Sequence, residues 1–116
     1  MKNYMAVFTG NPDGMAAWHA LDDATRARRE KEGMAAWMQW GVDHADAIVD
    51  NGGPLGRTKR VTGAGIADIR NNLAGYTVVR AESQEAAAKL FEGHPHFSIF
   101  PGDGVEVMEV LPIPQG

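Results

Sequence analysis

Two segments of the sequence carry apolar side chains on both of their faces, and they constrain the fold more than any other feature. Residues 4–9 and residues 75–81 alternate in the manner of β-strands, which place successive side chains on opposite faces of a sheet. In both segments each of the two alternating sets is largely apolar. Both faces of the sheet that they form are therefore expected to be covered.

A long helix is predicted between the first strand and the next extended segment. Asp22 or Asp23 offers an N-cap, and the pattern continues to about Val42. Only the second half has an apolar stripe, with Met34 and Trp37 followed by Met38, so this half is expected to pack on the sheet. The other expected elements are a helical turn at 15–20, strands at 45–49 and 105–111, a turn at 50–54, an extended segment at 55–62, an irregular segment at 63–74, a helix from the Ser83 N-cap to Gly93, and a proline-rich tail at 112–116.

The order of these elements predicts an α+β fold of the ferredoxin-like βαββαβ kind, with a four-stranded antiparallel sheet and room for an extra hairpin. With 116 residues, the chain is expected to form a single domain over 1–116. Two helices cover one face of such a sheet and leave the other as an exposed apolar patch. The expected cover is a second copy of the chain, so the sequence predicts a homodimer or a higher homo-oligomer.

Composition excludes or disfavours several classes of function. The chain has no cysteine, which excludes disulfides, thiolate metal sites and cysteine nucleophiles. Its formal net charge is −4 and its basic residues are mixed with acidic ones, so nucleic acid is not an expected partner. Neither a membrane-spanning run nor a signal peptide is apparent, so the expected location is cytoplasmic, with no membrane partner.

Several motifs, taken in order, resemble the YCII-related family of the dimeric α/β barrel superfamily. They are the turn at 50–56 (Asp-Asn-Gly-Gly-Pro-Leu-Gly), the segments 72–79 and 81–87, the His-Pro-His run at 94–96, and the closing segment 105–110. The resemblance implies a ferredoxin-like fold that assembles as a dimer. It also implies a small organic ligand, of an aromatic or lactone type, and cofactor-free acid–base chemistry by a histidine–aspartate pair.

The candidate catalytic residues are His44, which stands between Asp43 and Asp46, and Asp50. An imidazole titrates near neutral pH and suits proton transfer, although a histidine at the end of a helix is also favoured by the helix dipole. The candidate ligand-binding residues are Trp37, Trp40, Asn51, Gly53, Pro54, Tyr76, His94 and His96. The alternative for the tryptophans is a place in the core or in the dimer interface. The alternative for His94 and His96 is a turn after the helix that binds no ligand.

No metal site is predicted, because no third ligand follows His94 and His96 at a recognisable spacing. No cofactor is predicted either. The expected pocket lies between the second half of the long helix, the turn at 50–54 and Tyr76, near the dimer interface. Three alternatives stay open from the sequence. The chain is an acid–base enzyme acting on a small metabolite, a non-catalytic module that binds one, or an oligomerisation module.

Overall fold

A computed structural model describes residues 1–114; Gln115 and Gly116, at the end of the predicted tail, lie outside the described residues. Within this range four strands form one antiparallel sheet in the order β2-β5-β1-β6, and β3 and β4 form a separate hairpin. The elements are β1 (Lys2–Thr9), α1 (Pro12–His19), α2 (Asp23–Asp43), β2 (Ile48–Pro54), β3 (Thr58–Thr62), β4 (Gly65–Ile69), β5 (Leu73–Ala81), α3 (Gln84–Lys89), α4 (Pro95–Ser98) and β6 (Gly104–Glu109).

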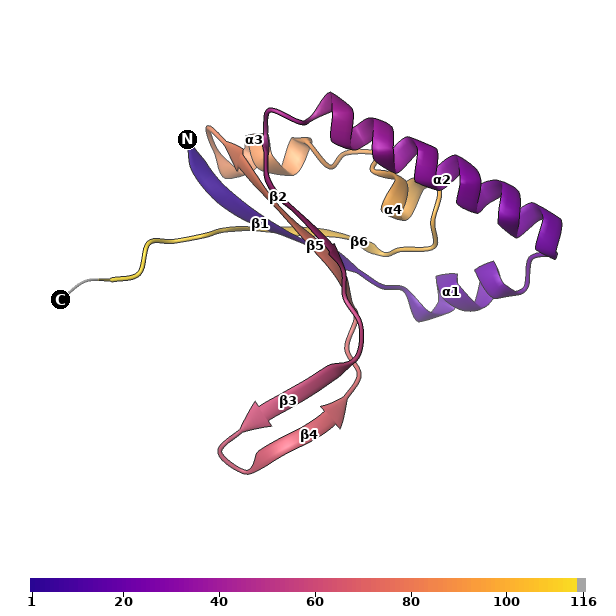
Figure 1. The fold of residues 1–116 in the computed structure, drawn as a ribbon, viewed down its shortest axis with the longest axis horizontal. Coiled ribbons are helices and arrows are strands. Elements are labelled where there is room, and N and C mark those ends of the chain that lie inside the picture. Colours follow the sequence, from indigo (N-terminus) through magenta and orange to yellow (C-terminus); the bar gives the residue numbers. More distant parts are fainter. Residues whose placement is uncertain (115–116) are drawn as a thin grey trace.

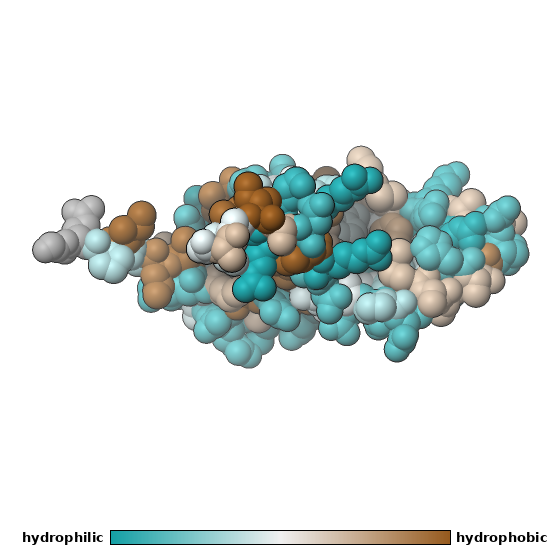
Figure 2. Space-filling model, turned by 90° about the horizontal axis from the view of Figure 1, so that it is seen from below, coloured by the Kyte–Doolittle hydropathy of each residue, from teal (hydrophilic) through white to brown (hydrophobic). Residues whose placement is uncertain are grey.

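The helices lie on one side of the four-stranded sheet, and the β3–β4 hairpin projects away from both layers (Figure 1). Figure 2 views the molecule from the hairpin side and shows apolar groups among polar ones. On the hairpin the side chains of Val61 and Ile66 are 73% and 71% exposed.

The core lies between the sheet and the helices. Tyr4, Ala6 and Phe8 of β1 face the helices, and the β5 residues paired with the first two are Val79 and Thr77. All five are buried, and Ala6 and Val79 are fully so. The alternation predicted for residues 4–9 and 75–81 therefore gives the observed inner face.

The outer face of the sheet is built from the alternate residues of the same strands. Met5 pairs with Val78 and Val7 pairs with Tyr76, and all four are only half-buried. The accessible surface of the chain is 8228 Å², against roughly 6,200 Å² for a compact protein of 12.5 kDa. The excess of about a third reflects this open face and the projecting hairpin.

Strand β2 differs from the prediction in two respects. It begins at Ile48, because residues 45–47 still form the turn that ends α2, and the predicted turn at 50–54 belongs to the strand itself. Its pairing with β5 is interrupted on both sides of Asp50. Gly52 has a φ of 60°, and a Cβ there would lie 2.0 Å from the Tyr76 carbonyl oxygen, so the glycine permits a bulge rather than a turn.

Three further segments differ from the prediction. The region at 63–74 is not irregular, since β4 and the start of β5 lie within it, which places the extra hairpin at 58–69. The helix after Ser83 ends earlier than expected, at Lys89. A short helix, α4, follows with His94 as its N-cap and Pro95 in its first turn, where the missing N–H of proline costs no hydrogen bond.

Gly33 explains how α2 meets the segment after α4. The residue is buried, and a Cβ added to it would lie 2.5 Å from the Phe100 ring. Alanine is favoured over glycine in helices by about 1 kcal/mol. At this position we expect Gly33→Ala to lower the free energy of unfolding by about 1–2 kcal/mol instead, because the ring must move.

Gly41 provides the matched control in the same helix, since a Cβ there meets no atom within 4 Å. Gly41→Ala is expected to raise the free energy of unfolding by up to about 1 kcal/mol. Urea denaturation of the two variants beside the parent measures both effects. Equal stabilisation by both substitutions would contradict the packing of Phe100 on Gly33.

Candidate functional site

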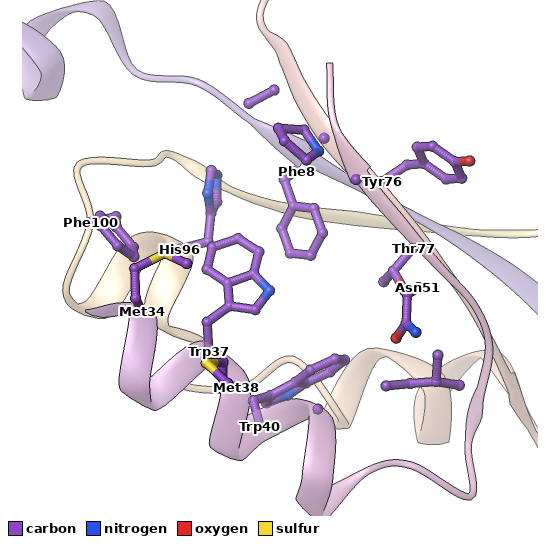
Figure 3. A pocket seen from close by; sticks show the side chains of 16 residues that line it. Phe8, Met34, Trp37, Met38, Trp40, Asn51, Tyr76, Thr77, His96 and Phe100 are labelled. Carbon is purple, nitrogen blue, oxygen red and sulfur yellow. The ribbon is translucent and has the colours of Figure 1, made fainter. Parts of the chain in front are cut away.

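A cavity of about 560 Å³ lies between the second half of α2 and the part of the sheet where β2 and β5 meet (Figure 3). Its size is that of a site for a small molecule. The lining residues come from β1, α2, β2, β5 and the region around α4: Phe8, Met34, Trp37, Met38, Trp40, Gly41, Ile48, Asn51, Gly53, Pro54, Ala74, Gly75, Tyr76, Thr77, His96 and Phe100.

Two indoles of α2 form the helical wall of the cavity. The ring of Trp37 packs against Phe8 with centroids 5.2 Å apart. Trp40 donates a hydrogen bond of 2.8 Å from its Nε1 to the carbonyl of Leu90, and its ring packs 5.1 Å from Phe91. The polar atom of Trp40 is thus satisfied outside the cavity, and the indole is held in place to present an apolar surface.

The other residues of the predicted apolar stripe behave differently. Met34 and Met38 do not pack flat on the sheet as expected, since their side chains are 56% and 70% exposed. Both line the cavity, and Figure 3 shows the thioether of Met34 extending from α2. Flexible thioether side chains at the rim of a cavity adapt readily to ligands of different shapes.

The cavity wall holds few polar groups. Of these, Thr77 donates its hydroxyl to the Asp50 carbonyl oxygen at 2.8 Å, and Tyr76 turns its ring away from Trp37 toward the outer face of the sheet (Figure 3). Asn51, His96 and the Nε1–H of Trp37, which has no hydrogen-bond partner within residues 1–114, complete the polar set. None of the lining residues is an aspartate, glutamate, lysine or arginine. An ion in this cavity would lack a charged partner, which makes its binding costly.

The predicted histidine pair lies at the junction of α4 with the cavity. His94 is fully buried, with its ring centroid 4.5 Å from Trp37 and 4.8 Å from Trp40. Its Nδ1 accepts the backbone N–H of His96 at 3.0 Å. The neutral ring therefore carries its proton on Nε2, and within residues 1–114 this Nε2 is buried without a hydrogen-bond partner. Burial, and then the nearby His96 and His44, lower the pKa of His94 from 6.5 to about 4.

The two predicted catalytic residues lie outside the cavity wall. His44 caps the end of α2, where its Nδ1 is 2.8 Å from the carbonyl oxygen of Trp40 and its ring packs on the Trp40 indole. Asp50 is exposed and accepts the Gly52 N–H at 2.9 Å. Neither residue lines the cavity, although the backbone of Asp50 binds the Thr77 hydroxyl and the ring of His44 packs on Trp40, and their catalytic role stays a prediction.

The cavity brings together seven of the eight predicted ligand-binding residues, and His94 lies behind its wall. The sequence interpretation missed Phe8 and Phe100, which join the wall only through tertiary packing. The alternation of residues 4–9 places Phe8 on one apolar face of its strand, and in the structure Phe8 also belongs to the core. For Phe100 the signal was the buried glycine of α2, Gly33, which leaves room for an aromatic ring.

Neither a metal cluster nor a membrane span is found in the part of the chain that the structure describes. Within residues 1–114 no three histidine, aspartate or glutamate side chains gather as metal ligands do. In the same range no helix has both the length and the hydropathy needed to cross a bilayer.

No protein-family model matches the chain, and no curated protein matches it. Among solved structures it is similar to 5-chloro-2-hydroxyhydroquinone dehydrochlorinase from Burkholderia phenoliruptrix AC1100, in complex with 2,5-dihydroxybenzoquinone. The two share 16% identity with a TM-score of 0.52, over 98% of this chain and 95% of that chain. At this identity the likeness shows the fold alone. It confirms the ferredoxin-like α+β class, whereas membership of the YCII-related family stays a prediction.

Proposed function

We propose that this chain binds a small, flat, uncharged organic molecule in the cavity between α2 and the sheet. The observation that carries the proposal is the composition of the cavity wall. It contains the indoles of Trp37 and Trp40 and has no carboxylate, ammonium or guanidinium group. A flat apolar molecule gains most from burial against aromatic rings, and an ion gains least in such surroundings. The quinone bound to the structural neighbour is a small flat ring, which supports the size and shape of the proposed ligand.

The proposal includes assembly as a homodimer of the YCII-related kind, with the cavity close to the interface. Tyr76 provides the connection, because it belongs to the cavity wall while its ring lies on the uncovered outer face of the sheet. A second copy on that face would therefore contact a residue that shapes the site. Acid–base catalysis by His44 and Asp50 is not part of the proposal, since neither residue lines the cavity.

Isothermal titration calorimetry at pH 7.5 with two naphthalene probes tests the ligand class. We expect uncharged 2-methoxynaphthalene to bind at least about tenfold more tightly than the anion 2-naphthoate, because the wall offers no cation to the carboxylate. Equal affinities, or tighter binding of the anion, would contradict the proposal.

Two substitutions in α2 show whether the probe occupies this cavity. Met38 and Val42 are equally exposed, at 70% and 71%, and only Met38 lines the cavity. Met38→Glu is expected to weaken binding of 2-methoxynaphthalene by about tenfold, because a carboxylate at the rim must lose water. Val42→Glu carries the same charge one turn later and should leave the affinity unchanged. A similar response of both variants would place the probe elsewhere.

A further inference from the structure

The hydrogen bond between His96 and Thr9 determines which ring nitrogen of His96 carries a proton. Nε2 lies 2.7 Å from the carbonyl oxygen of Thr9, and the side chain is 8% exposed. A carbonyl oxygen only accepts hydrogen bonds, so Nε2 must be the donor. In the neutral ring Nδ1 then has a free lone pair and no proton, which makes this nitrogen an acceptor.

The surroundings of His96 cover one edge of the ring and leave the other free. On the Nε2 edge, a Cβ added to Gly102 would lie 2.3 Å from Nε2 and 2.5 Å from Cε1, so backbone packs tightly there. Nδ1 makes no hydrogen bond to any residue of the range 1–114. It is also not among the fully enclosed, unpartnered side-chain atoms of that range, as His94 Nε2 is. Because His96 lines the cavity, its unused acceptor is available to a ligand.

Other contacts hold the His96 ring in this orientation. Its centroid lies 5.2 Å from that of Phe8 and 6.1 Å from that of Trp37, and its backbone N–H is bound by His94. The hydroxyl oxygen of Thr77, which donates its hydrogen to Asp50, and the amide oxygen of Asn51 are the other side-chain acceptors of the wall, so variants of His96 itself must show which group a ligand uses. An acceptor fixed before binding loses little conformational entropy when a ligand arrives.

On the basis of the proposed binding of a flat uncharged molecule, we propose that His96 selects ligands that carry a hydroxyl group. The Nδ1 lone pair accepts the hydroxyl hydrogen of an aromatic alcohol, and the Thr9 carbonyl holds the imidazole in the required tautomer. His96 is thus a specificity-determining residue, with Thr9 and Gly102 as residues that position it. A ligand without a hydrogen-bond donor would leave the buried acceptor unpartnered, which disfavours such a ligand.

The test compares 2-naphthol with 2-methoxynaphthalene, which has the same ring system and carries a methyl group in place of the donor hydrogen. Calorimetry at pH 7.5 should show 2-naphthol binding about tenfold more tightly to the unmodified protein. His96→Phe keeps a flat ring in the same packing and removes the acceptor. The variant should therefore bind 2-naphthol and 2-methoxynaphthalene with about equal affinity. His96→Asn places an amide oxygen near the position of Nδ1 and should restore part of the preference. The ratio of the two affinities is unaffected by a general loss of stability.

A second measurement uses the unmodified protein and does not depend on the folding of any variant. With ¹⁵N-labelled histidine, 2-naphthol should shift the Nδ1 resonance of His96, and 2-methoxynaphthalene should leave that resonance in place. Equal affinities of the two probes for the unmodified protein, or an unmoved Nδ1 resonance, would overturn the role of His96 and leave the proposed binding intact. If neither probe binds, the proposed function falls as well.

Discussion

Acidification from pH 6.5 to pH 4 is expected to lower the free energy of unfolding, with a contribution from His94 on the order of 2–3 kcal/mol. Burial lowers the pKa of this imidazole in the folded chain from 6.5 to about 4. Between these pH values the unfolded chain binds a proton that the folded chain does not bind. The stabilisation is therefore complete above pH 6.5, decreases as the pH falls, and is lost below about pH 4.

The structure also shows what protonation of His94 disrupts. Nδ1 accepts the N–H of His96, so a proton on Nδ1 would face another donor and break the hydrogen bond that begins α4. Because His96 and the indole of Trp37 are the neighbours of this ring, the loss reaches the wall of the cavity. Acid should thus weaken ligand binding over the same pH range in which it destabilises the fold.

His94→Asn separates this effect from the titration of carboxylates. Asparagine is a favoured N-cap and retains an acceptor for the His96 N–H, while its amide does not titrate. The variant is expected to be less stable at neutral pH, since it loses the packing on Trp37 and Trp40. Urea denaturation from pH 7 to pH 4 should show a smaller decrease for the variant than for the parent. Parallel curves would contradict a buried neutral His94.

The fold could be predicted where a single period decides the structure. The alternation in 75–81 gives both faces of β5, because a strand places every second residue on the same side. The prediction failed where a local signal has two meanings. Gly52 and Gly53 with Pro54 are typical of a turn, but pairing with β5 converts them into a bulged strand. Pro95, two residues after Gly93, is typical of the end of a helix, whereas in the structure it begins the next one.

The candidate site, like the fold, could be predicted from the sequence only in part. Trp37 and Trp40 could be assigned to one wall because they lie three residues apart in a helix, and Gly53 could be placed opposite them because β2 follows that helix. The special position of His96 could not be derived. It depends on the carbonyl of Thr9, which is 87 residues away in the sequence, and no local pattern contains this contact.

The sheet face that no helix covers leads to the prediction with the largest expected effect. Val78 lies near the middle of this face, between Met5 of β1 and Asp50 of β2, and is half-buried in the single chain. In a homodimer that joins these faces about a two-fold axis, residues near the axis lie close to their own copies, and the middle of the face is the position expected for that axis. A glutamate there would be buried without a partner and would face a like charge.

We therefore expect Val78→Glu to weaken dimerisation at least about a thousandfold, which corresponds to about 4 kcal/mol. In sedimentation velocity at micromolar concentration the parent should migrate with twice the chain mass, and the variant with the mass of one chain, 12.5 kDa. Val42→Glu is the matched control, because the same change on the exposed side of α2 adds equal charge away from the sheet. Circular dichroism establishes that each variant is folded. A monomeric parent would overturn the assembly, and a dimeric Val78→Glu variant would move the interface to another surface, for which the projecting β3–β4 hairpin is the next candidate.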